Sequence, residues 1–220
     1  MPDTGAVSEQ QPSSDATPPL AAGPVIVGLV LAAGAGRRFG SPKQLARFDG
    51  RPLLEHALLA MASARSLDGV VLVLGAHADA VLAGVERHGA SVVICGDWDE
   101  GQSASLRAGV AAVAGRADAV VVTLGDQPAV NARAIDRVVG ARDGVSLAVR
   151  ASYGRRPGHP VLLERELFGA VASLHGDEGA RGLLSATPVK LVACDGFGSD
   201  LDIDTAEELR LSAGGSTPAC

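Results

Sequence analysis

The order in which apolar residues recur along the chain restricts its fold more than any other feature. Short, mainly apolar runs alternate with segments whose apolar residues have helical spacing. The runs cover residues 25–31, 70–74, 91–95, 119–124 and 145–150. Strands that are apolar throughout are buried on both faces of a sheet, and the helices between them form right-handed crossovers. The pattern therefore predicts a three-layer α/β fold around a mostly parallel sheet.

The segments between these strands carry the signals of helices. Helices are predicted at residues 52–64, 79–88, 103–114 and 131–141. Pro52 suits a first helical turn, and Asn131 suits an N-cap. The last third is less regular, with strands predicted near Val161 and at 189–193 and helices at 164–174 and 179–185. Thr205-Ala-Glu-Glu208 has the pattern of a capping box that begins a final helix.

The two ends of the chain differ from its middle in composition. Residues 1–24 contain five prolines among Ser, Thr, Gln and Asp, and residues 213–220 are similarly poor in large apolar side chains. Such segments bury too little apolar surface to fold, so we expect a disordered Pro/Ser-rich tail and a flexible C-terminal tail. The predicted domain spans residues 25–212, a length that suits one domain.

Composition excludes several classes of function. The 19 Lys and Arg against 25 Asp and Glu give a net charge of -6, and aromatic residues make up only 3%. This argues against a nucleic-acid binder, which needs a basic face or stacking side chains. The longest apolar runs are far below the roughly 20 residues that span a bilayer. We therefore expect neither nucleic acid nor a membrane as partner.

The cysteines and the first residues bear on the compartment. Cys95, Cys194 and Cys220 form no C-x-x-C pair, which makes a zinc site or a disulfide framework improbable and fits a reducing compartment. The chain has no Lys or Arg before Arg37, so it lacks the charged start of a signal peptide. A cytoplasmic location is expected.

A glycine-rich loop follows the first predicted strand. Its sequence is Leu31-Ala-Ala-Gly-Ala-Gly-Arg-Arg-Phe-Gly-Ser-Pro-Lys43. Glycines let backbone N–H groups approach an anion, and the basic side chains add charge, so the loop favours a triphosphate over a plain strand-to-helix turn. The third glycine comes one residue too late for a dinucleotide fingerprint, and the Gly-Lys-Ser/Thr ending of a Walker loop is missing.

Carboxylates follow two later segments. Asp126 follows the fourth strand in Gly125-Asp-Gln-Pro128, where it could bind Mg²⁺ or belong to a turn. In the extended segment 202–205, Asp202 and Asp204 project to the same face. They form a candidate second ligand set, although Asp204 could instead cap the following helix.

Three further segments carry polar side chains. Ser103 and Ser105 follow the third strand and could bind a base, while Ser103 could equally be an N-cap. Arginine suits an anionic acceptor, and three arginines and a histidine occur late in the chain. His159 could bind the acceptor, transfer a proton or form a structural hydrogen bond. The residues are Arg155, Arg156, His159 and Arg181.

These motifs together resemble a known superfamily. Leu-Ala-Ala-Gly-x-Gly-x-Arg-x-Gly-x-x-Lys is similar to the signature of the MobA-like NTP transferases. The continuation Pro42-Lys-Gln-Leu45 resembles their molybdenum cofactor cytidylyltransferase branch. Gly-Asp-Gln-Pro, Gly-His-Pro, Gly-Asp-x-Gly-Ala-Arg and Asp-x-Asp-Thr follow in that branch's order. Pro157 departs from the pattern, because it separates the arginine pair from Gly158-His159.

The resemblance implies roles for individual residues. Arg38, Lys43 and Asp126 would be catalytic, and Asp126 and Asp202 would bind Mg²⁺. The implied acceptor-binding residues are Arg155, Arg156, His159 and Arg181. The implied nucleotide-binding residues are Leu31, Ala32, Ala33, Gly34, Gly36, Arg38, Lys43, Gly75, Ser103 and Ser105.

The resemblance also implies a fold and an activity. The fold would be the three-layer, Rossmann-like α/β fold of nucleotidyltransferases, with a mostly parallel, mixed sheet. The chain would transfer CMP from CTP to molybdopterin or molybdenum cofactor and release pyrophosphate. An apo molybdenum hydroxylase, or its chaperone, would be a further partner. Three alternatives stay open: GTP or another phosphorylated acceptor, an oxidoreductase-like assignment that some relatives of this branch carry, and a non-catalytic cofactor carrier.

Overall fold

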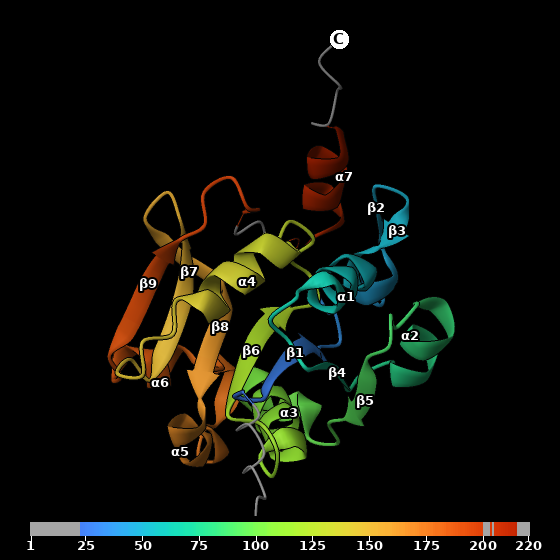
Figure 1. Cartoon of the computed structure of the whole chain (residues 1–220). Helices are drawn as coiled ribbons and strands as arrows, with labels where there is room; N and C mark the ends of the chain where they lie inside the picture. Colours follow the sequence, from blue (N-terminus) through green and yellow to red (C-terminus); the bar gives the residue numbers. More distant parts are fainter. Residues whose placement is uncertain (1–22, 200–202, 204, 215–220) are drawn as a thin grey trace, which may run out of the picture.

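A single mixed sheet organises the chain in the computed structural model, which describes residues 23–199, 203 and 205–214. The strand order is β5-β4-β1-β6-β8-β7-β9, and β8 runs antiparallel to both β6 and β7 while the other pairs are parallel (Figure 1). The strands are β1 (Ile26–Ala32), β4 (Gly69–Leu74), β5 (Ser91–Ile94), β6 (Ala119–Leu124), β7 (Ala148–Tyr153), β8 (Arg156–Glu164) and β9 (Val189–Ala193). A separate two-stranded ribbon joins β2 (Arg47–Phe48) and β3 (Arg51–Pro52).

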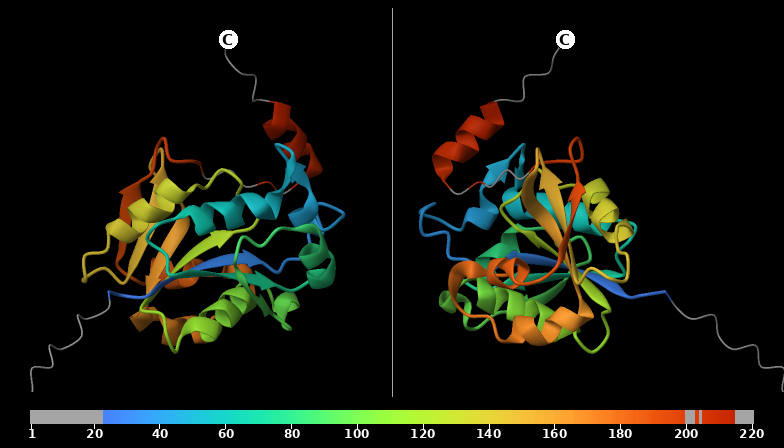
Figure 2. Two further views of the ribbon diagram at one scale, coloured as in Figure 1. Left: turned by 45° about the vertical axis from the view of Figure 1, so that its right-hand side comes forward. Right: turned by 90° about the vertical axis from the view of Figure 1, so that its left-hand side faces the viewer.

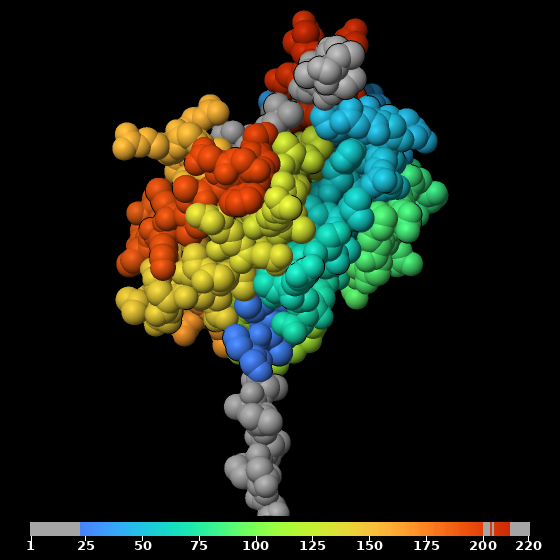
Figure 3. Space-filling view, turned by 45° about the horizontal axis from the view of Figure 1, so that its top comes forward, coloured from blue at the N-terminus to red at the C-terminus, as the bar shows by residue number. Residues whose placement is uncertain are grey.

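Helices cover both faces of the sheet, which confirms the predicted three-layer α/β class (Figure 2). On one face α1 (Leu53–Ser63) and α4 (Ala132–Gly140) lie side by side, as Figure 3 also shows. On the other face lie α3 (Gln102–Val113) and α5 (Phe168–Ala172). The sheet separates two apolar clusters, and the side chains of β1 alternate between them.

Shorter elements complete the fold. Three helices, α2 (Ala78–Gly84), α6 (Arg181–Ser185) and α7 (Ala206–Gly214), add to the four above. Helix α7 continues two residues past the predicted domain end at residue 212. Single 3₁₀ turns occur at η1 (Lys43–Leu45), η2 (Trp98–Glu100), η3 (Arg165–Leu167) and η4 (Gly176–Glu178). Within the described residues, none of the helices has the length and apolar character that crossing a bilayer requires.

Two predicted elements differ from the structure for identifiable reasons. The fifth strand begins at Ala148 rather than at Val145, because the Asp143 carboxylate accepts hydrogen bonds from the backbone N–H groups of Val145 and Ser146 and holds them in a turn. The helix predicted at 164–174 is shorter, since Glu164 ends β8 and the 3₁₀ turn η3 precedes α5.

Two helix starts have the caps that the sequence predicts. The Asn131 side chain accepts hydrogen bonds from the N–H groups of Arg133 at 3.0 Å and Ala134 at 3.3 Å. At α7 the Thr205 N–H donates to the Glu208 carboxylate, and the Glu208 N–H donates to the Thr205 hydroxyl. Both predictions are confirmed, because capping depends on residues close in sequence.

The Asn131 cap gives a first prediction. Asn131→Ala leaves two N–H groups of α4 without their acceptor, so we expect the free energy of unfolding to fall by about 1 kcal/mol. Asn131→Asp keeps the acceptor and should stay close to the wild type. Urea denaturation of the three proteins measures the difference, and equal stability of the alanine variant would contradict the role of the cap.

Candidate active site

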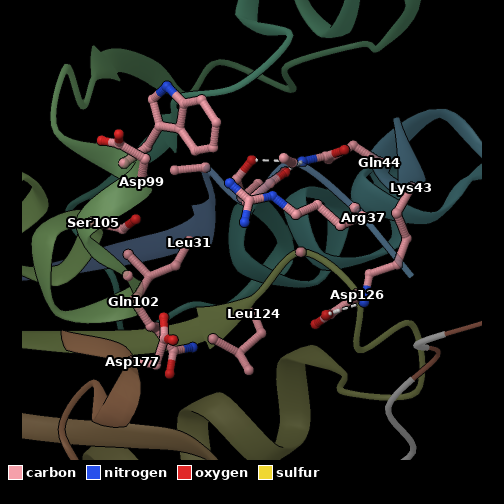
Figure 4. Close-up of a pocket in the computed structure, with 18 of the residues that line it drawn as sticks. Leu31, Arg37, Lys43, Gln44, Asp99, Gln102, Ser105, Leu124, Asp126 and Asp177 are labelled. Atoms are coloured by element: carbon pink, nitrogen blue, oxygen red, sulfur yellow. Dashed lines mark hydrogen bonds and ion pairs between the residues drawn. The ribbon is translucent and has the colours of Figure 1, made fainter. Parts of the chain in front are cut away.

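A cavity of about 430 Å³ lies beyond the carboxyl ends of β1 and β6 (Figure 4). This is the position at which open α/β sheets bind their ligands. Four segments and one separate residue form its wall. The separate residue is Asp177. The segments are residues 31–38, Lys43–Gln44, five residues between Trp98 and Ser105, and residues 124–126. Seven of the ten predicted nucleotide-binding residues come together in the loop part of this wall: Leu31, Ala32, Ala33, Gly34, Gly36, Arg38 and Lys43.

The glycine-rich loop makes a tight turn at Gly36. Its φ of 63° is in the left-handed region, and its carbonyl accepts hydrogen bonds from the N–H groups of Phe39 and Gly40. A Cβ at Gly36 would lie 2.7 Å from the Ser41 carbonyl oxygen. Only glycine fits both the conformation and the space. The turn returns the chain so that Lys43 lines the same cavity as the loop.

Gln44 is a site residue that the sequence analysis missed. Its side chain is buried, lines the cavity, and donates hydrogen bonds to the carbonyl oxygens of Ala32 and Gly34, both at 2.8 Å. The two carbonyl oxygens of the loop are thereby engaged by an amide, which reduces the repulsion that they would exert on a bound anion. The only sequence signal was a polar residue within Pro42-Lys-Gln-Leu45.

A second prediction follows for Gln44. Gln44→Met keeps much of the side-chain volume but leaves two carbonyl oxygens without a donor, at a cost of about 1–3 kcal/mol. We expect the affinity for CTP to fall about tenfold, which corresponds to 1.4 kcal/mol. Cytidine, which lacks phosphates, should bind the variant and the wild type alike. Calorimetric titration with both ligands tests this, and an unchanged affinity for CTP would show that Gln44 has no part in phosphate binding.

Asp126 and Lys43 meet at the end of the cavity opposite Asp99 (Figure 4). Lys43 Nζ lies 2.6 Å from Asp126 Oδ2, with the two side chains 15% and 25% exposed. Asp126 Oδ1 is buried and has no hydrogen-bond partner in the described part of the chain. The carboxylate is therefore only partly satisfied, and an additional cation would satisfy it further.

This carboxylate fits a divalent metal ion. Mg²⁺ is commonly held by one or two protein carboxylates and by substrate phosphates. The backbone N–H of Ile203 donates to the Asp126 carbonyl at 3.2 Å, which ties Ile203 to the end of β6. The predicted second ligand, Asp202, and its alternative, Asp204, lie outside the described residues.

The opposite end of the cavity is formed by η2 and the start of α3. Trp98, Asp99, Gln102 and Ser105 line it, so Ser105 lies where the sequence predicted it. Ser103 does not line the cavity: it is fully buried, and its hydroxyl donates to the His175 carbonyl at 3.2 Å. It is also not an N-cap, because Gly101 occupies that position.

Gly75 supports the cavity wall and does not line it. A Cβ at this position would overlap the Cβ of Trp98 and would lie 2.8 Å from the Ala33 carbonyl oxygen. The absence of a side chain therefore lets Trp98 pack close to the end of β4. Gly75 therefore has a packing role beneath Trp98, and its contact with the nucleotide stays a prediction.

The segment around η4 packs against the start of α3. A Cβ at Gly101 would meet the backbone of Gly176, and a Cβ at Gly179 would meet the Gln102 side chain. The Arg107 guanidinium also donates to the Leu174 carbonyl at 2.5 Å. These contacts bring Asp177 to the wall of the main cavity. The sequence motif that contains Asp177 was expected to bind the acceptor.

The four predicted acceptor residues separate into two places. His159 and Arg181 line a second cavity of about 80 Å³, together with Arg150, which the sequence analysis missed. Arg155 and Arg156 do not line either cavity. They belong to the tight turn between β7 and β8, where Gly154 and Arg155 have φ values of 55° and 69°, as a two-residue hairpin requires.

His159 is electrostatically unusual. Burial and the nearby Arg150 lower its pKa to about 4, so its imidazole is neutral near pH 7. Its own carbonyl oxygen accepts a hydrogen bond from the Tyr153 hydroxyl at 2.9 Å. This environment favours a neutral hydrogen-bonding role over storage of a proton.

Two curated proteins match most of the chain. It is 38% identical over 196 residues to nicotine blue oxidoreductase of Paenarthrobacter nicotinovorans, covering 84% of this chain and 95% of that protein. It is 32% identical over 196 residues to purine catabolism protein PucB of Bacillus subtilis, covering 84% of this chain and 94% of that protein.

Solved structures agree with the sequence matches. Rv0371c of Mycobacterium tuberculosis H37Rv superposes with a TM-score of 0.79 at 36% identity, covering 87% of this chain and 98% of that one. Its complex with manganese gives a TM-score of 0.74 at 34% identity, covering 87% and 99%. The family model of the MobA-like NTP transferase domain matches residues 28–191. The chain belongs to this MobA-like NTP transferase family and is a nucleotidyltransferase.

Proposed function

We propose that the protein transfers CMP from CTP to molybdopterin or molybdenum cofactor in a Mg²⁺-dependent reaction that releases pyrophosphate. The observation that carries the proposal is the juxtaposition of the glycine-rich loop with the Lys43–Asp126 pair in one 430 Å³ cavity. The loop suits the triphosphate, and Asp126 suits its metal ion. The choice of CTP and of the molybdopterin acceptor rests on the cytidylyltransferase-like motifs of the sequence.

The chain's own residues have distinct tasks in this reaction. Arg38 and Lys43 bind the β- and γ-phosphates and stabilise the charge of the leaving pyrophosphate. An acceptor phosphate oxygen forms a bond to the α-phosphorus, while the bond from that phosphorus to the bridging oxygen breaks and pyrophosphate leaves in line. Lys43 also pairs with Asp126, with 2.6 Å between Nζ and Oδ2, so it links the phosphate site to the proposed metal ligand.

Asp126 is the proposed metal ligand, with Asp202 as the second. Mg²⁺ bound there would neutralise the negative charge that develops on the α-phosphate during transfer. The buried Asp126 Oδ1 supports this assignment. Rv0371c, which is 34% identical to this chain, has been solved in complex with manganese, and this supports a divalent metal ion as part of the proposal.

The proposed base site lies around Ser105 and Gln102. The cavity there also contains the carboxylates of Asp99 and Asp177. A carboxylate can accept a hydrogen bond from the exocyclic amine of cytosine, and a Gln amide can both donate and accept. These side chains are compatible with CTP. Because guanine also presents an exocyclic amine, the choice between CTP and GTP is decided by comparing pyrophosphate release from the two nucleotides.

Nucleotide-dependent thermal stabilisation tests the binding part of the proposal. A ligand that binds only the folded chain raises its melting temperature. CTP with Mg²⁺ should raise the melting temperature, and NADPH should not.

The second candidate function is an oxidoreductase, favoured by the 38% identical nicotine blue oxidoreductase. Stabilisation by NADPH and not by CTP would favour that candidate.

The partner and the location are also parts of the proposal. An apo molybdenum hydroxylase, or its chaperone, would receive the product. The cytoplasm would be the site of synthesis, which agrees with the two described cysteines, Cys95 and Cys194, being buried free thiols.

A further inference from the structure

The second cavity is a neighbour of the proposed nucleotide site. Gln102 lines both cavities, and η4 contributes Asp177 to the first and Glu178 to the second. The second cavity lies against Val122 of β6 and Val161 of β8, on the face of the sheet that α3 covers. Its volume of about 80 Å³ corresponds to two or three water molecules at roughly 30 Å³ each, the size class of one tetrahedral oxyanion.

Two arginines give this cavity a positive charge. Backbone carbonyls hold the Arg150 guanidinium: its Nε donates to Gly158 at 3.1 Å and its Nη2 to Pro157 at 3.3 Å. Burial, together with the charge of the nearby Arg181, lowers the pKa of Arg150. Among the described residues, neither arginine has a carboxylate within 4.0 Å.

The remaining lining side chains suit the same kind of ligand. The neutral imidazole of His159 can donate one hydrogen bond without adding charge. Leu106 and Leu184 provide apolar wall, where an ionic contact is less weakened by water. Glu178 lines the cavity as well. Its carboxylate offsets one of the two arginine charges, so the three side chains together carry one positive charge.

We propose that this cavity is a subsite for one phosphate-sized oxyanionic group, bound by Arg150, Arg181 and His159. The group is separate from the nucleotide triphosphate, which the Lys43–Asp126 end of the main cavity would hold. Its source is either a second anionic group of the acceptor substrate or free inorganic phosphate. The acceptor source rests on the proposed function; the oxyanion site itself does not.

Inorganic phosphate is the probe, and the full chain is titrated after a non-hydrolysable CTP analogue and Mg²⁺ have been added. Phosphate should bind and should shift the ¹⁵N resonances of the His159 ring. Arg150→Gln and Arg181→Gln should each weaken binding at least tenfold. The matched control is Arg133→Gln, exposed on α4 and outside both cavities, and it should bind like the wild type.

Two results would overturn the proposal. One is equal phosphate affinity in the wild type and both glutamine variants, and the other is loss of phosphate binding when the CTP analogue is present. Arg181 is exposed on α6, so its variant keeps the test valid if Arg150→Gln does not fold.

The source of the anion follows from kinetics. An acceptor KM raised about tenfold in Arg181→Gln, with the KM for CTP unchanged, assigns the group to the acceptor. Phosphate binding with an unchanged acceptor KM keeps the site and assigns it to the free ion. If the wild type releases no pyrophosphate from any nucleotide, the proposed function fails, while the phosphate titration still decides the oxyanion site.

Discussion

Asp126→Asn should lower the rate of pyrophosphate release by about 10²–10³-fold, the usual effect of removing one electrostatic group that acts in the transition state. The change removes the charge that pairs with Lys43 and that would hold the proposed metal ion, and it keeps the side chain's shape. The overall fold should persist, because Asp126 lies at the tip of β6 and not in either apolar cluster.

The control for Asp126→Asn is Asp79→Asn. Asp79 is exposed in the first turn of α2 and does not line the main cavity. Circular dichroism and thermal melting of both variants separate a loss of chemistry from a loss of structure. Turnover of Asp126→Asn at the wild-type rate in excess Mg²⁺ would remove Asp126 from the metal site.

Lys43→Gln should have two opposite effects. It should lower kcat/KM by about 10²-fold, because a cation beside the leaving pyrophosphate is lost. It should also raise the affinity for Mn²⁺ in the absence of nucleotide, because Lys43 Nζ lies 2.6 Å from the Asp126 oxygen that a metal ion would contact. A structural defect alone would not tighten metal binding.

Lys190→Gln is the matched control for Lys43→Gln. Lys190 also pairs with a carboxylate, that of Asp143 at 3.1 Å, but on β9 and away from the cavity. It should leave both Mn²⁺ affinity and kcat/KM unchanged. Mn²⁺ binding followed by electron paramagnetic resonance is the measurement. Equal affinities in the wild type and Lys43→Gln would mean that the lysine and the metal ion do not share Asp126.

Features that depend on neighbouring residues could be predicted from the sequence. The strand at 119–124, the Asn131 cap and the Thr205–Glu208 capping box are confirmed. The α/β class follows from the alternation of strands and helices. In each case the residues that decide the structure lie within one element or one loop.

Features that depend on distant contacts could not be predicted. The direction of β8 is set by a tight turn at Gly154–Arg155 and by its insertion between β6 and β7, and an apolar run does not encode direction. The docking of η4 on the start of α3 joins segments about 75 residues apart, and it brings Asp177 to the main cavity.

Distant contacts also decide which of the predicted site residues line a cavity. Arg155 and Arg156 have suitable chemistry, but the hairpin carries them away from both cavities, while Arg150 reaches the second cavity. Gln44 lies within the Pro42-Lys-Gln-Leu45 motif, but its role could not be predicted because it depends on two carbonyl oxygens of the preceding loop. Side-chain type predicts chemistry, and only the fold decides which side chains meet.

The most direct test of the proposed reaction is acceptor-dependent release of pyrophosphate. The full chain is incubated with Mg²⁺, molybdenum cofactor and one nucleotide at a time: CTP, GTP or ATP. We predict release with CTP that depends on the cofactor, with much slower release from GTP and ATP. Release of no pyrophosphate from any of the three nucleotides in the presence of the acceptor would contradict the account.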